Sequence, residues 1–228
     1  MKQIKTGIVG LDELLGGGLA QGSSTIIVGP AGTLKSFIGQ QFIYEGLRMG
    51  EPCVYISIAQ DLDSVEDQVK LNFGWSFKPY LKKGQLKFLD LYSLWAEKPL
   101  DVTKTLDLTQ LMNMICKAEE EAGGGRELLH NFSTLFNFTA DDQSVLRMAY
   151  AIRAKAKKAG TTVLFLLDEG AQNKRDEENL KSLCDYILTT DVRGKERKIR
   201  VTKSLIKHGL EWHDLILTEE GVKVEVIS

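Results

Sequence analysis

Residues 24–36, STIIVGPAGTLKS, decide the fold class of this chain. The first six residues form an apolar run rich in β-branched side chains, which predicts a buried strand. Glycines and a proline follow, and the apolar pattern of residues 34–49 then predicts a helix that Gly50 closes. A strand, a glycine-rich turn and a helix in this order are typical of an α/β fold.

The turn nearly matches the phosphate-binding pattern G-x-x-x-x-G-K-[ST], except that Leu34 stands where the pattern has glycine. In such a loop, backbone N–H groups and the start of the helix surround phosphate oxygens. Lys35 is expected to reach the β- and γ-phosphates of a nucleotide, and the Ser36 hydroxyl to ligate Mg²⁺ if a nucleotide binds. The expected phosphate-binding residues are Gly29, Pro30, Ala31, Gly32, Thr33, Leu34, Lys35, Ser36 and Phe37.

Strand-like and helix-like runs alternate along the rest of the chain, which predicts a mostly parallel sheet with helices on both faces. The further predicted strands are residues 53–58, 86–90, 127–131, 162–167 and 183–189, followed by short strands and hairpins over 199–227. The further predicted helices are residues 64–72, 105–122 and 141–159. No stretch has the composition of an inter-domain linker, so we expect one domain.

Composition excludes several classes of protein. Of the 228 residues, 43% are hydrophobic and 26% are charged, as in a globular protein, and the net charge of −2 gives no support for nucleic-acid binding. Three widely spaced cysteines do not suggest a disulfide framework or a metal cluster. No run approaches the ~20 apolar residues of a membrane span, and the polar start is unlike a signal peptide. We therefore expect a cytoplasmic protein that does not enter a membrane.

Three further stretches carry a resemblance to a known family. They are residues 6–23, TGIVGLDELLGGGLAQGS, residues 51–75, EPCVYISIAQDLDSVEDQVKLNFGW, and residues 187–205, ILTTDVRGKERKIRVTKSL. Together with GPAGT-KS they resemble the KaiC-like and RadA-like branch of the RecA superfamily of ATPases, over nearly the whole chain. The resemblance implies a three-layer RecA-like P-loop NTPase fold with C-terminal β-hairpins, as one domain over residues 1–228.

The same resemblance implies a cofactor and partners. The cofactor would be ATP or ADP, with Mg²⁺ if the nucleotide binds; an empty pocket is the alternative. The partner would be a second copy of this chain, or a paralogous RecA-family subunit, in a ring or filament.

Four positions depart from the family pattern. Besides Leu34, the usual Glu-Glu pair after the second strand is Ala59-Gln60, and an amide cannot take a proton from water as a carboxylate does. The metal-binding aspartate of the Walker B strand corresponds to Asn131, a weaker partner for a hard cation. The family's Lys-x-Arg, which reaches a neighbouring subunit's site, is Lys203-Ser204-Leu205. These changes predict a pseudo-ATPase, with little or no hydrolysis, that acts by binding a nucleotide or a protein partner.

Two alternatives remain open. Asp168 and Glu169 end another apolar strand, expected beside the phosphate-loop strand, and could support slow Mg²⁺-dependent ATP hydrolysis. A recombinase-like protein that binds single-stranded DNA is the other. Its loops would be residues 132–142 and 170–179, but neither is basic, and the aromatic residues Phe132, Phe136 and Phe138 suit a core or a subunit contact better.

Residues 193–203 carry the basic patch of the chain, which we expect on an exposed hairpin that could also bind phosphate or an acidic partner. The three histidines, His130, His208 and His213, lack metal-ligand spacing, so structural or surface roles are expected for them.

Overall fold

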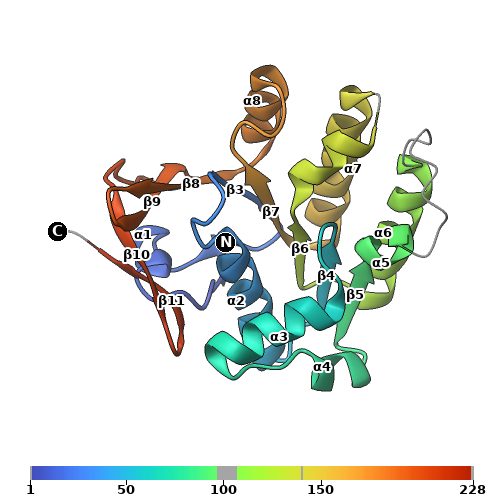
Figure 1. Ribbon diagram of the computed structural model, residues 1–228, viewed down its shortest axis with the longest axis horizontal. Coiled ribbons are helices and arrows are strands. Elements are labelled where there is room, and N and C mark those ends of the chain that lie inside the picture. Colours follow the sequence, from blue (N-terminus) through green and yellow to red (C-terminus); the bar gives the residue numbers. More distant parts are fainter. Residues whose placement is uncertain (1, 97–106, 140, 227–228) are drawn as a thin grey trace.

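The computed structural model describes residues 2–96, 107–139 and 141–226 (Figure 1). Within these residues a nine-stranded sheet forms the centre of the molecule. Its strands are β3 (Ser24–Gly29), β4 (Cys53–Ser57), β5 (Leu86–Asp90), β6 (Arg126–His130), β7 (Thr162–Asp168), β8 (Tyr186–Arg193), β9 (Glu196–Lys203), β10 (His213–Thr218) and β11 (Gly221–Glu225). Their order across the sheet is β11-β10-β9-β8-β3-β7-β6-β4-β5.

The sheet has a parallel and an antiparallel part. Strands β5, β4, β6, β7, β3 and β8 are parallel to one another, and β9, β10 and β11 continue the sheet in antiparallel pairing from β8. A mostly parallel sheet with C-terminal hairpins is what the sequence predicts. Each strand predicted before β8 is present within one residue of its expected bounds.

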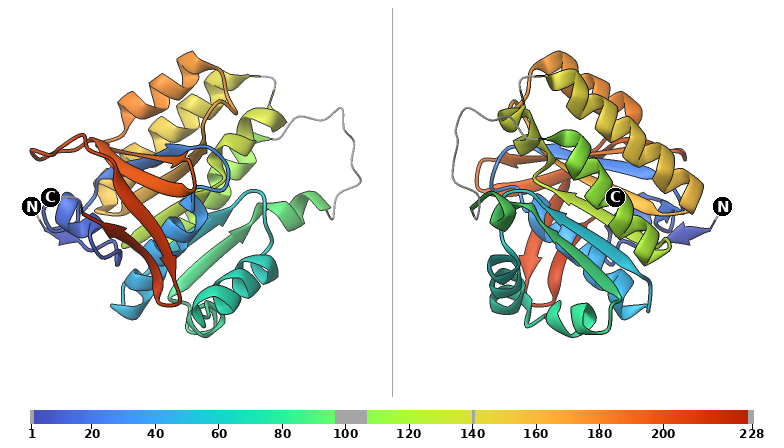
Figure 2. Two further views of the ribbon diagram at one scale, coloured as in Figure 1. Left: turned by 60° about the vertical axis from the view of Figure 1, so that its left-hand side comes forward. Right: turned by 90° about the vertical axis from the view of Figure 1, so that its right-hand side faces the viewer.

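Helices cover both faces of the sheet, so that the molecule has three layers (Figure 2). The helices on one face are α2 (Lys35–Arg48), α3 (Leu62–Phe73) and the short α4 (Lys78–Lys82). The other face is covered by α5 (Leu91–Ala96), α6 (Leu108–Ala122), the 3-10 helix η1 (Phe132–Phe138), α7 (Asp142–Ala159) and α8 (Lys174–Leu183). Successive side chains of β6 point to opposite faces of the sheet. Leu128 packs in the core beneath α2 and α3, and Leu129 packs in the core on the other face.

The N-terminal segment packs beside the C-terminal hairpins. It contains β1 (Gln3–Ile4), α1 (Leu11–Leu14) and β2 (Leu19–Ala20), and β1 pairs with β2 in a separate antiparallel sheet. The Val224 amide donates to the Val9 carbonyl at 2.8 Å, which joins this segment to β11. The two ends of the described chain therefore support each other.

The predicted helices over residues 34–49, 64–72 and 141–159 are confirmed as α2, α3 and α7. The helix predicted from residue 105 is described from Leu108 onward, and its first residues lie outside the described part. Helix α8 differs from expectation, because its sequence is mostly charged and looks like a loop. It forms because the Asn173 side chain caps it by accepting from the Asp176 amide, and because Leu180 and Leu183 are buried.

A buried carboxyl group lies in the sheet. Glu127 of β6 has no exposed surface, and burial, together with the neighbouring Glu119 carboxyl of α6, raises its pKa well above 4.5. Lys155 of α7 lies 3.9 Å from Glu119 and partly offsets the charge of this pair. We infer that Glu127 keeps its proton in the folded protein at pH values where the unfolded chain has lost it.

Glu127→Gln should therefore stabilise the protein increasingly as pH rises. The folded wild type binds more protons than the unfolded chain above the ordinary pKa of 4.5, so its free energy of unfolding falls as pH increases. The variant cannot ionise and escapes this loss. Urea denaturation between about pH 5 and pH 8 should show the advantage of the variant growing, whereas the exposed Glu120→Gln should show no such trend. Parallel curves for wild type and Glu127→Gln would contradict the inference.

Candidate functional site

The glycine-rich loop joins the end of β3 to the start of α2, as the sequence predicts. A Cβ atom on Gly29 would lie 2.2 Å from the Thr190 carbonyl oxygen, so only glycine lets β3 and β8 approach here. Gly32 has φ +82° and open space around it. Within the described chain, the amides of residues 31–34 have no backbone acceptor. Free N–H groups at a helix N-terminus fit phosphate oxygens.

Leu34 adopts the left-handed conformation, with φ 66° and ψ 12°. This conformation costs a side-chain-bearing residue roughly 1–2 kcal/mol, and glycine would adopt it without that cost. The isobutyl group is only 9% exposed and packs in the core cluster that includes Ile38. Leu34 also lines the cleft that lies beside the loop, but most of its side-chain surface lies against protein. The loop therefore keeps the bend of a phosphate cradle.

Lys35 is held at the floor of the loop. Its Nζ donates to the carbonyls of Gly29 at 2.7 Å and Pro30 at 2.6 Å, and lies 3.0 Å from Asp168 Oδ1. The sheet brings Asp168 here, because β7 pairs with β3 in a register that sets Asp168 opposite Gly29. The expectation that the strand ending at Asp168 lies beside the phosphate-loop strand is confirmed. Glu169 is exposed and does not line the cleft.

His130, rather than Asn131, contacts the serine that would ligate Mg²⁺. His130 Nε2 lies 2.9 Å from Ser36 Oγ, and its Nδ1 lies 2.9 Å from the Tyr55 hydroxyl. Burial lowers the pKa of His130 to about 4, so the ring is neutral at pH 7. The sequence reasoning placed Asn131 at the metal position and gave His130 a structural role. The signal in the sequence was the polar residue His130 at the last position of β6, one residue before Asn131.

Neutral amides surround the same region. Asn131 lines the cleft in a left-handed conformation, and its buried Oδ1 has no partner among the described residues. Gln68 of α3 also lines the cleft and accepts from the Gln40 amide at 2.8 Å. Gln60 follows β4 at the same edge of the sheet, but it is not among the residues that line the cleft.

The basic patch contributes Arg197 to the cleft. The sequence pattern does not distinguish this arginine from the other basic residues of the patch. Arg197 lies on β9, and its Nε donates to the Gly32 carbonyl at 2.9 Å. Lys203, in contrast, donates to the carbonyls of Ser182 and Cys184, and Leu205 is 47% exposed. The pairing of β8 with both β3 and β9 carries Arg197 to the loop, a contact across 165 positions that no local pattern reveals.

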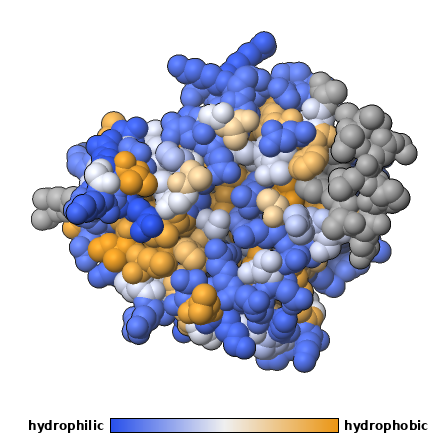
Figure 3. Space-filling model, in the orientation of Figure 1, coloured by the Kyte–Doolittle hydropathy of each residue, from blue (hydrophilic) through white to orange (hydrophobic). Residues whose placement is uncertain are grey.

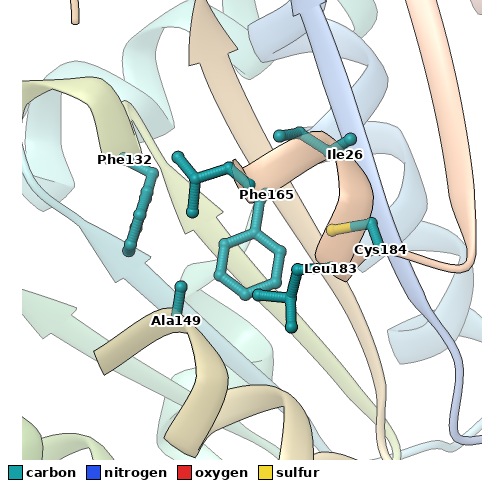
Figure 4. Close-up of a pocket in the computed structure, with 7 residues that line it drawn as sticks. Ile26, Phe132, Ala149, Phe165, Leu183 and Cys184 are labelled. Atoms are coloured by element: carbon teal, nitrogen blue, oxygen red, sulfur yellow. The ribbon is translucent and has the colours of Figure 1, made fainter. Parts of the chain in front are cut away.

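Together these residues line a cleft of about 430 Å³, a size that suits a small ligand. The lining residues are Ala31, Gly32, Leu34, Lys35, Ser36, Phe37, Gln68, His130, Asn131, Leu166, Asp168 and Arg197. A second hollow, between the sheet and α7 and α8, is lined by Phe165 and other apolar side chains and does not admit a water molecule (Figure 4). It is a packing gap in the core.

The donor set fits a nucleotide phosphate better than it fits Mg²⁺. Free amides, Lys35 and Arg197 suit anionic oxygens. Ser36 faces a neutral imidazole, and the carboxylate of the lining, Asp168, is paired with Lys35. A search of the described residues finds no group of three or more His, Cys, Asp or Glu side chains that could hold a metal ion. Mg²⁺ prefers carboxylate oxygens, which the Ser36 side of the cleft does not offer.

Two of the three aromatic residues considered for DNA contact are buried. Phe132 and Phe136 of η1 are buried in the core, and Phe138 is 42% exposed. The second candidate loop continues into α8, where Asp176 and Glu177 are buried. In the described part of the chain, no helix has the length and apolar character needed to cross a bilayer.

This chain is similar to several known proteins. The family model for the KaiC ATPase matches residues 4–227. A UPF0273 protein of Thermotoga maritima is 33% identical over 98% of this chain and 96% of its own length. The circadian clock protein KaiC3 of Synechocystis is 26% identical over 100% of this chain and 46% of its own length. A crystal structure of a KaiC-like protein from Pyrococcus horikoshii has the same fold, with a TM-score of 0.83 at 19% identity and 99% coverage of both chains. This chain belongs to the KaiC family of ATPases.

Proposed function

We propose that this protein is a nucleotide-binding KaiC-type domain with little or no ATP hydrolysis, which acts by binding. ATP or ADP would serve as a structural or switching ligand. The observation that carries the proposal is the 2.9 Å contact between His130 Nε2 and Ser36 Oγ. It puts a neutral group where a metal-supporting carboxylate is expected, beside a phosphate cradle that retains its shape.

Binding is supported by groups that do not depend on catalysis. The loop amides, the N-terminus of α2 and the ammonium of Lys35 converge on one cleft. Lys35 bonds two loop carbonyls and Asp168, and those contacts keep it directed into the loop. A nucleotide phosphate would replace the carbonyls as its partners.

Weak hydrolysis is supported by the lack of a suitably placed base among the described residues that line the cleft. Gln60 cannot accept a proton from water, and Asn131 offers a neutral carbonyl oxygen. Within the described lining, the remaining carboxylate is Asp168. It is already paired with Lys35 at 3.0 Å.

A slow Mg²⁺-dependent ATPase is the second candidate, and the position of Asp168 favours it. The Asp168 side chain is 38% exposed at the edge of the cleft, so it can meet solvent and ligand. If Lys35 moved to a phosphate, Asp168 would be free to act through a bound water. Its neighbour Glu169 is exposed and is not among the residues that line the cleft, so it is the weaker candidate.

We also propose assembly with a second copy or a paralogous subunit. Apolar side chains gather on the face where α1, β10 and β11 lie (Figures 1 and 3). Val9 is 76% exposed, and Leu205, Ile206 and Leu210, which follow β9, are 47%, 37% and 61% exposed. Exposed apolar residues gathered at one end of a molecule favour a protein contact.

The purified chain should bind ATP and ADP in calorimetric titration, with steady-state hydrolysis near the buffer rate. Lys35→Ala should weaken binding by about tenfold or more, because one charge-assisted contact to phosphate is lost. The exposed Lys195→Ala is the matched control and should bind as wild type does. Robust turnover that disappears in Lys35→Ala would contradict the proposal. Residual turnover that Asp168→Asn and Glu169→Gln together abolish would support the slow ATPase.

Leu34→Gly tests whether the departure from the loop pattern closes the cradle. Because the isobutyl group packs mainly in the core, the variant should change nucleotide affinity less than about threefold. It should lower thermal stability, since the loss of a buried side chain (about 2–5 kcal/mol) exceeds the relief of backbone strain. A gain in affinity of tenfold or more would show instead that Leu34 obstructs phosphate.

A further inference from the structure

We propose that this cleft binds the nucleotide as a metal-free polyphosphate, with Lys35 and Arg197 supplying the positive charge that Mg²⁺ supplies elsewhere. The inference rests on the proposed function, because it concerns the same cleft. It follows from the poor fit between Mg²⁺ and the groups around Ser36. Three observations carry it, concerning the partners of Ser36, the charges of the lining and the reach of Arg197.

The first observation is a line of buried hydrogen bonds that ends on Ser36. Tyr55 is fully buried, and the described hydrogen bonds give its hydroxyl one acceptor, His130 Nδ1. The Tyr55 O–H is then directed to His130 Nδ1, 2.9 Å away. Because Nδ1 accepts from Tyr55, the hydrogen of the buried ring lies on Nε2, which donates to Ser36 Oγ across 2.9 Å. Ser36 thereby receives a hydrogen bond and can turn its own O–H toward a phosphate oxygen.

A Mg²⁺ ion needs the opposite arrangement. A serine that ligates the ion presents a lone pair, and a nearby carboxylate offsets the charge of the ion and its waters. Here the donor from His130 occupies one lone pair of Ser36 and carries no negative charge. Asn131 and Gln68, which also line the cleft, are neutral amides.

The second observation is the balance of charge. Among the described lining residues, Lys35 and Arg197 are cationic and Asp168 is anionic. Asp168 is already paired with Lys35 at 3.0 Å. The cleft therefore has an excess of positive charge, to which the N-terminus of α2 adds. An uncomplexed polyphosphate is more anionic than its Mg²⁺ complex and fits this excess better.

The third observation is the position of Arg197. Its Nε is anchored on the Gly32 carbonyl at 2.9 Å, so the guanidinium lies at the rim of the phosphate loop. Guanidinium groups bind phosphate through two parallel N–H donors. Arg197 is exposed on the hairpin of β8 and β9 and lines the cleft, so its guanidinium can meet a ligand there. It can take the outer phosphate of a nucleotide while Lys35 takes an inner one.

The experiment is calorimetric titration of the full-length chain with ADP and with ATP, in EDTA and in excess Mg²⁺. For wild type, we expect Kd in EDTA to equal the value in Mg²⁺ or to be lower. Arg197→Gln should weaken binding in EDTA by about tenfold, whereas Lys195→Gln, in the same hairpin, should leave it unchanged.

A matched pair of substitutions tests the role of His130. His130→Asp places a carboxylate beside Ser36, so binding should weaken in EDTA and tighten about tenfold or more on addition of Mg²⁺. His130→Asn should remain insensitive to Mg²⁺, because it changes the ring without adding charge. If His130→Asp does not fold, the wild-type and Arg197→Gln titrations still decide the matter.

The outcomes separate the two proposals. Wild-type binding that is about tenfold or more tighter in Mg²⁺ than in EDTA would overturn metal-free binding and leave the nucleotide-binding function intact. Full affinity of Arg197→Gln in EDTA would overturn the role of Arg197. No binding at millimolar nucleotide in either buffer would overturn the proposed function itself, and this inference with it.

Discussion

Parallel pairing of β3 with β7 on one side and β8 on the other is the constraint on which the site depends. Parallel strands end at the same edge of a sheet, so the residues that follow them meet there. The pairing sets Asp168 opposite Gly29, and Val28 opposite Thr189. Gly29 is required because any Cβ would strike the Thr190 carbonyl. The phosphate loop can form only where these three strands meet.

The next layer of the site depends on polar groups buried inside an apolar sheet. Tyr55 and His130 come from β4 and β6, and neither is more than 1% exposed. Such groups are costly to bury unless each finds a partner, and the line from Tyr55 through His130 to Ser36 provides those partners. The same burial keeps His130 uncharged, so the site gains a fixed donor and no negative charge.

Binding and hydrolysis make different demands on a nucleotide site, and this chain treats them differently. A phosphate cradle needs free amides, a helix N-terminus and a cation, all of which surround the cleft. Hydrolysis needs a base for water and a carboxylate for the metal, and the corresponding positions hold amides and an imidazole. Loss of the second set need not disturb the first, because the cradle is mostly backbone.

The strands, the main helices and the phosphate loop could be predicted from the sequence because their signals are local. Apolar runs, glycines and caps act within a few residues of one another, and Lys35 and Ser36 follow directly from the loop pattern. Helix α8 was missed because its mostly charged sequence gives a weak apolar pattern, and only its docking on the sheet buries Leu180 and Leu183. Side chains that meet through sheet pairing give no local signal.

By itself, the sequence determined that this is an α/β protein with a phosphate loop, and it predicted altered catalytic positions. Only the tertiary structure decided that His130, and not Asn131, faces Ser36. A shift of one residue along β6 changes which side chain stands at the end of the strand. The tertiary structure also decided that Arg197 belongs to the cleft and that Lys35 is paired with Asp168. The contact of His130 with Ser36 spans 94 positions of the chain, and the contact of Arg197 with Gly32 spans 165. Asp168 reaches Lys35 because β7 pairs with β3. These contacts exist because the order of strands in a sheet is set by packing, which no local pattern encodes.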